Sequence, residues 1–574
     1  MVYYQPVKQA LEQAVDAVVK DVFNIDIAIE LTRPDEQFGD FATNIALQLA
    51  KQVGQNPRQV AEALQPKLLE SSPLLAKVDI AGPGFLNLFV TDDALQTERV
   101  KMVEHQGQQY GKSDLYDGKT VVAEYSDPNP FKVLHAGHLY TSVVGDAIAN
   151  LLEYAGATVH RVNFGGDVGL HVGKTIWAII QKLGGELPER LSEVPETERS
   201  QWMADAYVEG NNRYDEDVVA KAEMIELNKR VYQIHAADDR TSPLAQIYWT
   251  CRDWSYDYFN AFYDSIGTKF EKYYPESSVA ELGLQTVKAE LARGVFKESD
   301  GAVVFDGEVH GLHTRVFINN QGIPTYEAKD VGLIMQKWAD YHFDRSIIIT
   351  GNEQEQYMAV VLKAVEQFRP ELVAATSHLT HGLVKLAGGV KMSSRKGNIL
   401  RAVDVIEAAN EANKQLVGQE NRDTVLAAVK YAFLKNRTGG DIIYDPAESV
   451  SLQGNSGPYL QYAYVRALSI IRKKAAPAGE APEMDAWQLQ PAERSLVRKM
   501  SEYPEVVERA TKELMPHHIA TYLYELAQKF NQFYEHNQVI GNERQDYRLL
   551  IVSAYAGILQ NGLRLLGIPT PEKM

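Results

Sequence analysis

The chain has 574 residues, of which 23% are charged and 45% hydrophobic, a composition typical of a folded protein rather than a disordered one. Its length exceeds what one hydrophobic core normally serves, so we expect three or more domains. A single cysteine, Cys251, excludes an intrachain disulfide and a cysteine-based zinc site, and it favours a reducing cytoplasm. Residues 1–23 have the pattern of an amphipathic helix rather than a signal peptide, and no apolar run reaches the length of a membrane span. We therefore expect a cytoplasmic protein that is neither exported nor embedded in a membrane.

The net charge of −18 argues against a nucleic-acid partner, because lysine and arginine are needed to neutralise phosphates. The charge is unevenly distributed, however. Residues 451–574 carry 14 lysines and arginines against 13 aspartates and glutamates, whereas the rest of the chain carries 44 against 63. The last fifth of the chain therefore repels a polyanion least, although it is not a basic patch.

Residues 1–115 alternate helical and strand-like segments. Residues 38–44 open a helix that continues to Leu49, and residues 80–90 are typical of a turn followed by an alternating strand. On pattern alone, this region is a small α+β domain without chemistry.

Residues 120–154 are the most informative stretch. An apolar run precedes a proline-broken loop, and apolar residues then recur at helical spacing, which predicts a strand, a loop and a helix. The sequence His-Ala-Gly-His at 135–138 stands where the helix begins. The glycine lets a base or phosphate approach the backbone, the helix dipole favours an anion, and two imidazoles three residues apart can donate to an α-phosphate. A helix start with a capping polar residue would explain this tetrapeptide equally well.

A second strand, residues 158–164, and a glycine-rich turn at 165–169 follow this helix. This order predicts a parallel α/β unit, whose ligand would bind beyond the carboxyl ends of the strands. The acidic stretch 185–244 interrupts the pattern. We expect a helical insertion there, with its charges on a solvated face.

Two later segments add polar groups. Tyr326 and Asp330 are one turn apart on a helix expected over residues 326–338, so they share a face, as a packing tyrosine and a surface aspartate also would. The apolar strand 346–350 ends in a polar loop, residues 351–354. This loop is a second position where a ligand is expected to bind.

A basic loop follows the strand at 379–384. Residues 391–398 read Lys-Met-Ser-Ser-Arg-Lys-Gly-Asn, with three cations and two hydroxyls between glycines. Such a loop is suited to clamping a triphosphate. Alone it would be an ordinary solvated charge run, but it stands 256 residues after the first histidine of the HAGH sequence.

These motifs together resemble a known family. HAGH followed by KMSSRKGN resembles the HIGH and KMSKS signatures of class I aminoacyl-tRNA synthetases, and the details are similar to the arginyl-tRNA synthetase family. EYSDPNPFKVLHAGHL, TYEAKD, GNEQ and LTHGLV resemble catalytic motifs of that family. FGDFATNIALQLAK and GPGFLNL resemble its additional N-terminal domain, and the segment from NSGPYLQYAYVRALSI onward resembles its helical anticodon-binding domain. The resemblance covers nearly the whole chain.

The resemblance implies a multidomain α/β fold, with a Rossmann-like parallel-sheet catalytic domain, an N-terminal α+β domain and a C-terminal all-α helical bundle. The expected divisions are 1–115 for the N-terminal tRNA-binding domain, 116–385 for the catalytic domain with its insertion near 185–244, 386–450 for the KMSKS-type loop and connecting helices, and 451–574 for the anticodon-binding domain.

The resemblance also implies an arginine–tRNA ligase. The arginine carboxylate would attack the ATP α-phosphate, and the arginyl group would pass from the adenylate to the terminal ribose of tRNA(Arg). Mg²⁺ would arrive with ATP, without a resident metal or structural zinc. Family behaviour further implies a monomer that activates arginine only when tRNA is present.

Site residues are implied by the same motifs. The catalytic residues are His135, His138, Lys132 and Lys391. The ATP-binding residues are His135, Gly137, His138, His381, Leu383, Val384, Lys391, Met392, Ser393 and Ser394. The arginine-binding residues are Glu124, Asn129, Tyr326, Asp330 and Gln354. The tRNA-binding residues are Phe85 and Asn87.

The chain departs from the family pattern at two places. Ser394 stands where the KMSKS signature has a lysine, and Lys132, three residues before His135, is expected to supply the missing cation. Val168 replaces a tryptophan that often follows the Gly-Asp pair, which we interpret as a packing change.

Two other classes of protein share some of these features. Another adenylyl-transferring HxGH enzyme would be shorter or, for cysteine, would need zinc-binding cysteines. A non-enzymatic RNA-binding paralogue has no need to keep His135, His138, Lys132 and Lys391. Pyrophosphate exchange with ATP, arginine and tRNA separates these alternatives.

Overall fold

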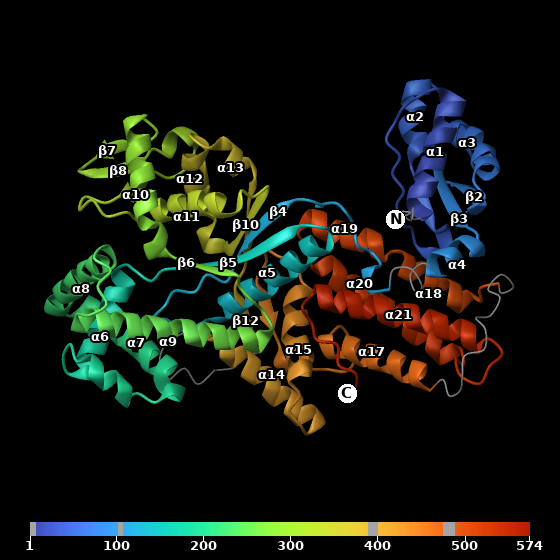
Figure 1. Ribbon diagram of the computed structural model, residues 1–574. Coiled ribbons are helices and arrows are strands. Elements are labelled where there is room, and N and C mark those ends of the chain that lie inside the picture. Colours follow the sequence, from blue (N-terminus) through green and yellow to red (C-terminus); the bar gives the residue numbers. More distant parts are fainter. Residues whose placement is uncertain (1–6, 101–106, 388–399, 474–487) are drawn as a thin grey trace.

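The computed structural model describes residues 7–100, 107–387, 400–473 and 488–574 (Figure 1). Three regions follow one another: a small N-terminal unit, a central region around a parallel sheet, and a C-terminal group of helices. This arrangement confirms the predicted fold class. Along the described parts of the chain, none of the helices combines the length and apolar character needed to cross a bilayer.

The N-terminal unit is a three-stranded antiparallel sheet, of order β1-β3-β2, covered by helices. Leu86, Leu88 and Val90 alternate along β3 and lie in one hydrophobic cluster with the buried faces of α1, α2 and α3. Because side chains alternate across a strand, Phe85 and Asn87 point to the opposite face. The elements are α1 (Val7–Phe23), β1 (Phe41–Thr43), α2 (Ile45–Val53), α3 (Pro57–Ser71), β2 (Leu75–Ala81), β3 (Phe85–Val90) and α4 (Asp92–Val100).

The central region is built on a five-stranded parallel sheet of order β11-β10-β4-β5-β6. From β4 the chain continues to β5 and β6 on one side of the sheet, and it then returns to β10 and β11 on the other side of β4. The strand order therefore reverses between β4 and β10. Val121, Val122 and Ala123 of β4 are fully buried, since both faces of the sheet are covered. The strands are β4 (Thr120–Glu124), β5 (Thr158–Gly165), β6 (Lys272–Pro275), β10 (Arg345–Gly351) and β11 (Thr376–His381).

Helix α5 (Ala136–Tyr154) connects β4 to β5 and contacts both the sheet and the C-terminal helices. Its apolar residues are buried almost all round, as expected for a helix enclosed between two layers. The backbone of α5 lies directly against the Tyr125 ring at Gly145. A Cβ at this position would lie 2.2 Å from the ring. The other helices around the sheet are α10 (Glu276–Ala292), α11 (Tyr326–Tyr341), α12 (Glu355–Glu366) and α13 (Pro370–Ala374), and a small antiparallel sheet joins β7 (Lys297–Ser299), β8 (Ala302–Phe305) and β9 (Arg315–Ile318).

A helical subregion follows β5. Its core holds Val172, Ile176 and Ile179 of α6, against which the next helices pack. Residues 185–244 of the expected insertion lie in this subregion. The helices are α6 (Leu170–Leu183), α7 (Arg199–Glu216), α8 (Val218–Ala236) and α9 (Pro243–Ile266).

In its described residues, the C-terminal region is helical apart from one short strand pair, β12 with β13. Its aromatic residues are mostly internal: Tyr522, Phe530, Phe533 and Tyr555 are at most 2% exposed. The elements are β12 (Val384–Leu386), α14 (Ala402–Val417), α15 (Arg422–Leu434), β13 (Ile442–Tyr444), α16 (Pro446–Ser449), α17 (Gly457–Arg472), α18 (Pro491–Ser501), α19 (Tyr503–Glu513), α20 (His517–His536) and α21 (Gln545–Leu565).

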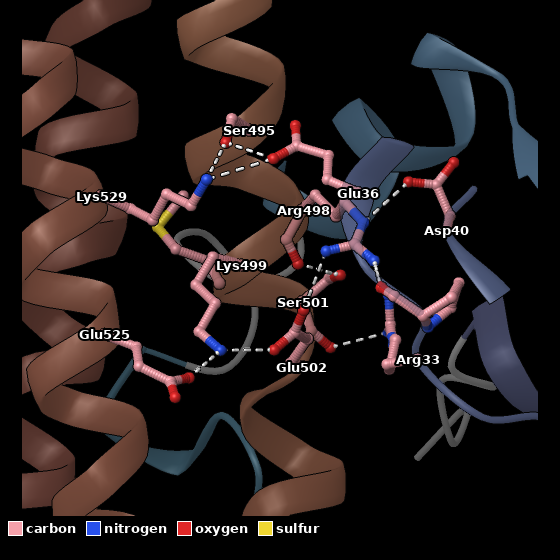
Figure 2. A network of polar contacts seen from close by, with 12 residues as sticks. Arg33, Glu36, Asp40, Ser495, Arg498, Lys499, Ser501, Glu502, Glu525 and Lys529 are labelled. Carbon is pink, nitrogen blue, oxygen red and sulfur yellow. Dashed lines mark hydrogen bonds and ion pairs between the residues drawn. The ribbon is translucent and has the colours of Figure 1, made fainter. Parts of the chain in front are cut away.

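The N-terminal unit docks on α18 through charged side chains (Figure 2). Asp40 is 1% exposed and pairs with Arg494 at 2.8 Å and with Arg498 at 3.3 Å, both from α18. At the edge of the same contact, Lys529 pairs with Glu36 at 3.2 Å. One buried carboxylate with two arginines therefore stands at the centre, with solvated pairs around it.

Candidate functional site: a cavity at the reversal of the parallel sheet

A cavity of about 920 Å³ opens at the carboxyl ends of β4, β10 and β11, beside the start of α5. This is the point where the strand order reverses, the expected ligand position in an open parallel sheet. The structure brings together most of the described residues that the motifs predicted. Those lining the cavity are Glu124, Asn129, His135, Gly137, His138, Tyr326, Asp330, Gln354, His381, Leu383 and Val384.

Two stacked imidazoles mark the start of α5. His135 is the N-cap, and its Nδ1 accepts a hydrogen bond from the Gly137 N–H at 3.1 Å. His138 Nδ1 accepts from the His135 N–H at 3.0 Å, and the ring centres lie 3.7 Å apart. The two histidines therefore form a reciprocal cap. Since each Nδ1 is an acceptor, each Nε2–H remains a donor.

The environment keeps both imidazoles neutral. Partial desolvation lowers the pKa of His135, although part of this residue is exposed; the charge of Glu353 opposes this shift, and that of Lys132 adds to it. Burial and the neighbouring His135 hold the pKa of His138 well below its ordinary value. Two neutral N–H donors and the N-terminal end of α5 thus face the cavity, which suits a phosphate whose charge grows during reaction.

His381, at the end of β11, closes the same side of the cavity. Its Nε2 lies 2.7 Å from the Thr141 hydroxyl of α5, and its Nδ1 lies 2.9 Å from the Gly382 carbonyl oxygen. Leu383 is 59% exposed and directly precedes β12. An apolar side chain is thus available at the cavity mouth, where a flat base could lie.

The loop between β4 and α5 has an unusual backbone. Ser126, Asp127 and Phe131 have φ values of +74°, +50° and +67°. These lie in the left-handed region, which residues other than glycine rarely adopt. Asp127 Oδ1 accepts from the Phe164 N–H of β5 at 2.8 Å, and Phe131 N–H donates to Ser255 at 3.0 Å. Strain of this kind persists only where the surroundings hold it, and it is concentrated at functional sites.

A buried ion pair lies at one end of the cavity. Glu124, at the end of β4, pairs with Lys337 of α11, and Lys337 Nζ also donates to Ser346 Oγ at 3.3 Å. The Glu124 and Lys337 side chains are 3% and 1% exposed. Glu124 therefore enters the cavity with its charge already balanced by the protein.

Asp330 has a neutral partner instead. It accepts a hydrogen bond from the Tyr357 hydroxyl of α12. Burial raises the pKa of Asp330 to about 8, and the nearby Glu124 acts in the same direction. A permanently charged cation entering beside Asp330 would favour its ionised form.

Asn129 and a second buried pair line the far wall. Asn129 Oδ1 accepts from the Gly166 N–H at 2.7 Å, and Lys329 pairs with Glu276 at 2.6 Å. A Cβ at Gly166 would lie 2.8 Å from both Asn129 Oδ1 and Glu276 Oε1, so a larger residue there would displace the ends of these two side chains. Tyr326, one turn before Asp330, is half exposed at the cavity mouth.

The remaining predicted residues lie elsewhere. Lys132 lies outside the cavity lining, with its Nζ 5.1 Å from the centre of the Tyr207 ring of α7. On β3, Phe85 is 41% exposed, whereas Asn87 is 8% exposed. Lys391, Met392, Ser393 and Ser394 fall outside the described residues.

Sequence reasoning missed several residues of this site. Lys337, Lys329 and Glu276 carry charges that the pattern assigns to surfaces, yet all three are buried. The one available signal is spacing, since Lys337 lies two helical turns after Asp330 on the same face. Tyr357 follows the Gly-Asn-Glu-Gln loop by three residues and had no distinguishing pattern.

Sequence models of known families match this chain in three places. The model described as "tRNA synthetases class I (R), catalytic domain" matches residues 99–445, more than half of the chain. The chain belongs to this family. A DALR anticodon binding domain matches residues 460–574, and an arginyl tRNA synthetase N terminal domain matches residues 5–90. The resemblance to the arginyl-tRNA synthetase family drawn from the motifs is thereby confirmed.

Full-length relatives support the same placement. The chain is 28% identical to an arginine–tRNA ligase of Phocaeicola vulgatus, covering 99% of this chain and 100% of the relative. It is 29% identical to one of Treponema denticola, covering 97% and 96%. Among solved structures, arginyl-tRNA synthetases of Thermus thermophilus and Plasmodium falciparum have the same fold, with TM-scores of 0.79 and 0.81. Their identities are 24% and 21%, and they cover 99% and 100% of this chain and the whole of each structure.

Proposed function

We propose that the cavity joins L-arginine to ATP and that the arginyl group then passes to tRNA(Arg). The observation that carries this proposal is the composition of one cavity: two neutral imidazole donors and a set of buried carboxylates at the carboxyl ends of parallel strands. The first set suits a reacting phosphate, and the second suits a guanidinium.

ATP would lie beside the start of α5. The Nε2–H groups of His135 and His138, with the cations of Lys132 and Lys391, would stabilise charge on the phosphates. The adenosine part would contact Gly137, His381, Leu383 and Val384, together with Met392, Ser393 and Ser394. Mg²⁺ would come as part of the ATP substrate. Among the described residues, no group of three or more potential ligand side chains forms a metal site, and the absence of a resident metal stays a prediction.

Arginine would bind among the carboxylates. Lys337 already balances Glu124, whereas Asp330 is hydrogen-bonded to the neutral Tyr357, so Asp330 would take the charge of the guanidinium, with Tyr326 packing against its plane. Asn129 and Gln354 would hold the α-amino end, and Glu124 would accept from the remaining N–H groups. This division places the substrate carboxylate toward the imidazoles.

The reaction needs positioning and charge neutralisation rather than a protein nucleophile. The arginine carboxylate oxygen forms a bond to the α-phosphorus while the bond to the β-phosphate oxygen breaks, releasing pyrophosphate. The terminal ribose hydroxyl of the tRNA then attacks the arginyl carbonyl, loses its proton, and displaces AMP. Cys251 is buried, and burial raises the pKa of its thiol, so it takes no part.

The tRNA would bind at both ends of the chain, in a monomer. Exposed Phe85 offers a ring for a base in the tRNA elbow, and Asn87 lies on the same strand face. The proposed divisions are 1–115 for the elbow-binding domain, 116–385 for catalysis, 386–450 for the basic loop and its helices, and 451–574 for the anticodon. The cytoplasmic location stays a prediction.

Arginine-dependent exchange of labelled pyrophosphate into ATP, in the presence of tRNA(Arg), tests this function. We expect exchange with arginine and little with lysine, whose point charge cannot fill a site built for a planar fork. Exchange that is equal for both amino acids would reject the proposed pocket. Exchange without any tRNA would contradict only the expected order of steps.

A further inference from the structure

Helix α7, from the subregion that the motifs left without a role, reaches the loop that carries Lys132 and the segment around Arg401. The centre of the Tyr207 ring lies 5.1 Å from the ammonium of Lys132, in the loop before α5. One and a half turns earlier, Gln201 Oε1 accepts from Arg401 Nη1 at 3.1 Å, at the start of α14. One helix therefore contacts two segments that lie more than 260 residues apart in the sequence.

These two segments are themselves paired. The Ala136 N–H donates to the Leu400 carbonyl at 2.8 Å, and the Ala402 N–H donates to the Leu134 carbonyl at 2.9 Å. His135 and Arg401 form the bridge between them. The backbone that presents the first imidazole is thus fixed to the backbone beside Arg401, with α7 contacting both.

Lys132 needs a fixed position to act on a phosphate. Its side chain is long and flexible, and ordering it costs rotamer entropy. Its charge already lowers the pKa of His135, of His138 and of His171, so the ammonium lies within electrostatic reach of the proposed phosphate site. An aromatic face attracts an ammonium without neutralising it, unlike a carboxylate.

We propose that Tyr207 is a positioning residue, which holds Lys132 beside the imidazole pair through its ring face, and that α7 thereby braces the phosphate site. The inference rests on the proposed role of Lys132. It gives the α7 region a part in adenylate formation, rather than only a solvated face.

Tyr207→Leu tests the brace directly. Loss of a cation–π contact should lower the rate of arginine-dependent exchange about two- to thirtyfold at saturating arginine. Tyr207→Phe keeps the ring and should exchange at close to the wild-type rate. Tyr214→Leu is the matched control: Tyr214 lies two turns further along the same face of α7 and contacts Lys174 and Lys221 instead. Its exchange rate should not change.

A double-mutant comparison separates this inference from the proposed function. If Lys132→Ala exchanges normally, the proposed role of Lys132 is wrong. If Lys132→Ala is impaired while Tyr207→Leu is normal, only the brace is rejected. Where both single variants are impaired, Lys132→Ala/Tyr207→Leu should be no worse than Lys132→Ala, and a further fall would show that Tyr207 acts independently of Lys132. Should Tyr207→Leu fail to fold, Tyr207→Met offers a longer and more flexible apolar side chain, also without an aromatic face, and must give the same fall.

Discussion

The cavity and the contact between the N-terminal unit and the C-terminal helices are both built from ion pairs, but water reaches them differently. In the cavity, the Glu124 and Lys337 side chains are 3% and 1% exposed. At the edge of the domain contact, Lys529 and Glu36 are both 37% exposed (Figure 2). Desolvated charges are costly unless each keeps its partner, whereas solvated pairs contribute little and are screened by salt.

This difference separates a site that must keep one arrangement from the edge of a domain contact, which can adjust around the buried Asp40 at its centre. In the cavity, Glu124 and Glu276 each have an internal lysine, and Asp330 has only a tyrosine hydroxyl. The pocket is thus prepared for one more cation. At the domain contact, by comparison, every carboxylate named above already has its partner.

Breaking the buried pair should have the largest effect. Lys337→Met leaves the Glu124 charge without its partner, so the free energy of unfolding should fall by about 3–5 kcal/mol in urea titrations. The double variant Lys337→Met/Glu124→Gln removes both charges and should regain most of that stability while remaining poor in arginine binding. A single variant as stable as the wild type would show that water reaches this pair.

Asp330→Asn should act on substrate rather than on folding. It removes the charge that meets the guanidinium, so the KM for arginine should rise at least a hundredfold, within the about 3–5 kcal/mol expected for a broken buried charge pair. The KM for ATP should change little. Steady-state exchange kinetics measure both constants, and an unchanged KM for arginine would place the pocket elsewhere.

The raised pKa of Asp330 makes arginine binding depend on pH. Burial raises it to about 8, so at pH 7 the empty pocket holds this carboxyl mainly protonated. Arginine binding should then release up to about one proton, and affinity should rise with pH until about 8 and then level off. The contribution of Asp330 to the free energy of unfolding has the opposite pH dependence. It is complete at low pH and is lost as pH rises through about 8.

Calorimetry in buffers of different ionisation enthalpy measures this proton release. The Asp330→Asn protein is the control and should release none on binding arginine. Equal proton release by the two proteins would assign the titration to another group.

The smallest effect is expected at the solvated edge of the domain contact. Lys529→Ala removes pairing with Glu36 and Ser495, and it should cost less than about 1 kcal/mol of stability at low salt and nothing measurable in high salt. Thermal unfolding at two salt concentrations measures this difference. A salt-independent loss as large as that of Lys337→Met would remove the distinction between the two regions.

The sequence predicted the strands and helices of the site better than the pairing of its buried charges. The strand, loop and helix around the HAGH sequence were predictable, because the spacing of apolar residues and the positions of glycines are local signals of secondary structure. The resemblance placed Asp330, Glu124 and Asn129, which the fold brings into one cavity. Burial of Lys337 was not predictable, since lysine on a helix is ordinarily solvated and only the tertiary fold brings Glu124 to it.

Contacts between residues far apart in the sequence were also not predictable. No local pattern indicates that Tyr207 in the α7 region meets Lys132, or that Asp40 in the N-terminal unit meets Arg494 and Arg498. The same holds for Asn87. Its strand was predictable, but its 8% exposure depends on the neighbouring strands.

In the proposed mechanism, the neutral imidazole pair at the start of α5 stabilises the reacting phosphate. Arginine-dependent pyrophosphate exchange by His138→Ala, measured with tRNA(Arg) beside the wild type, tests this most directly. The rate should fall by about 10²–10³ with little change in arginine binding, because the lost donor acts on charge that develops during reaction. A His138→Ala protein that exchanges at the wild-type rate would contradict the account.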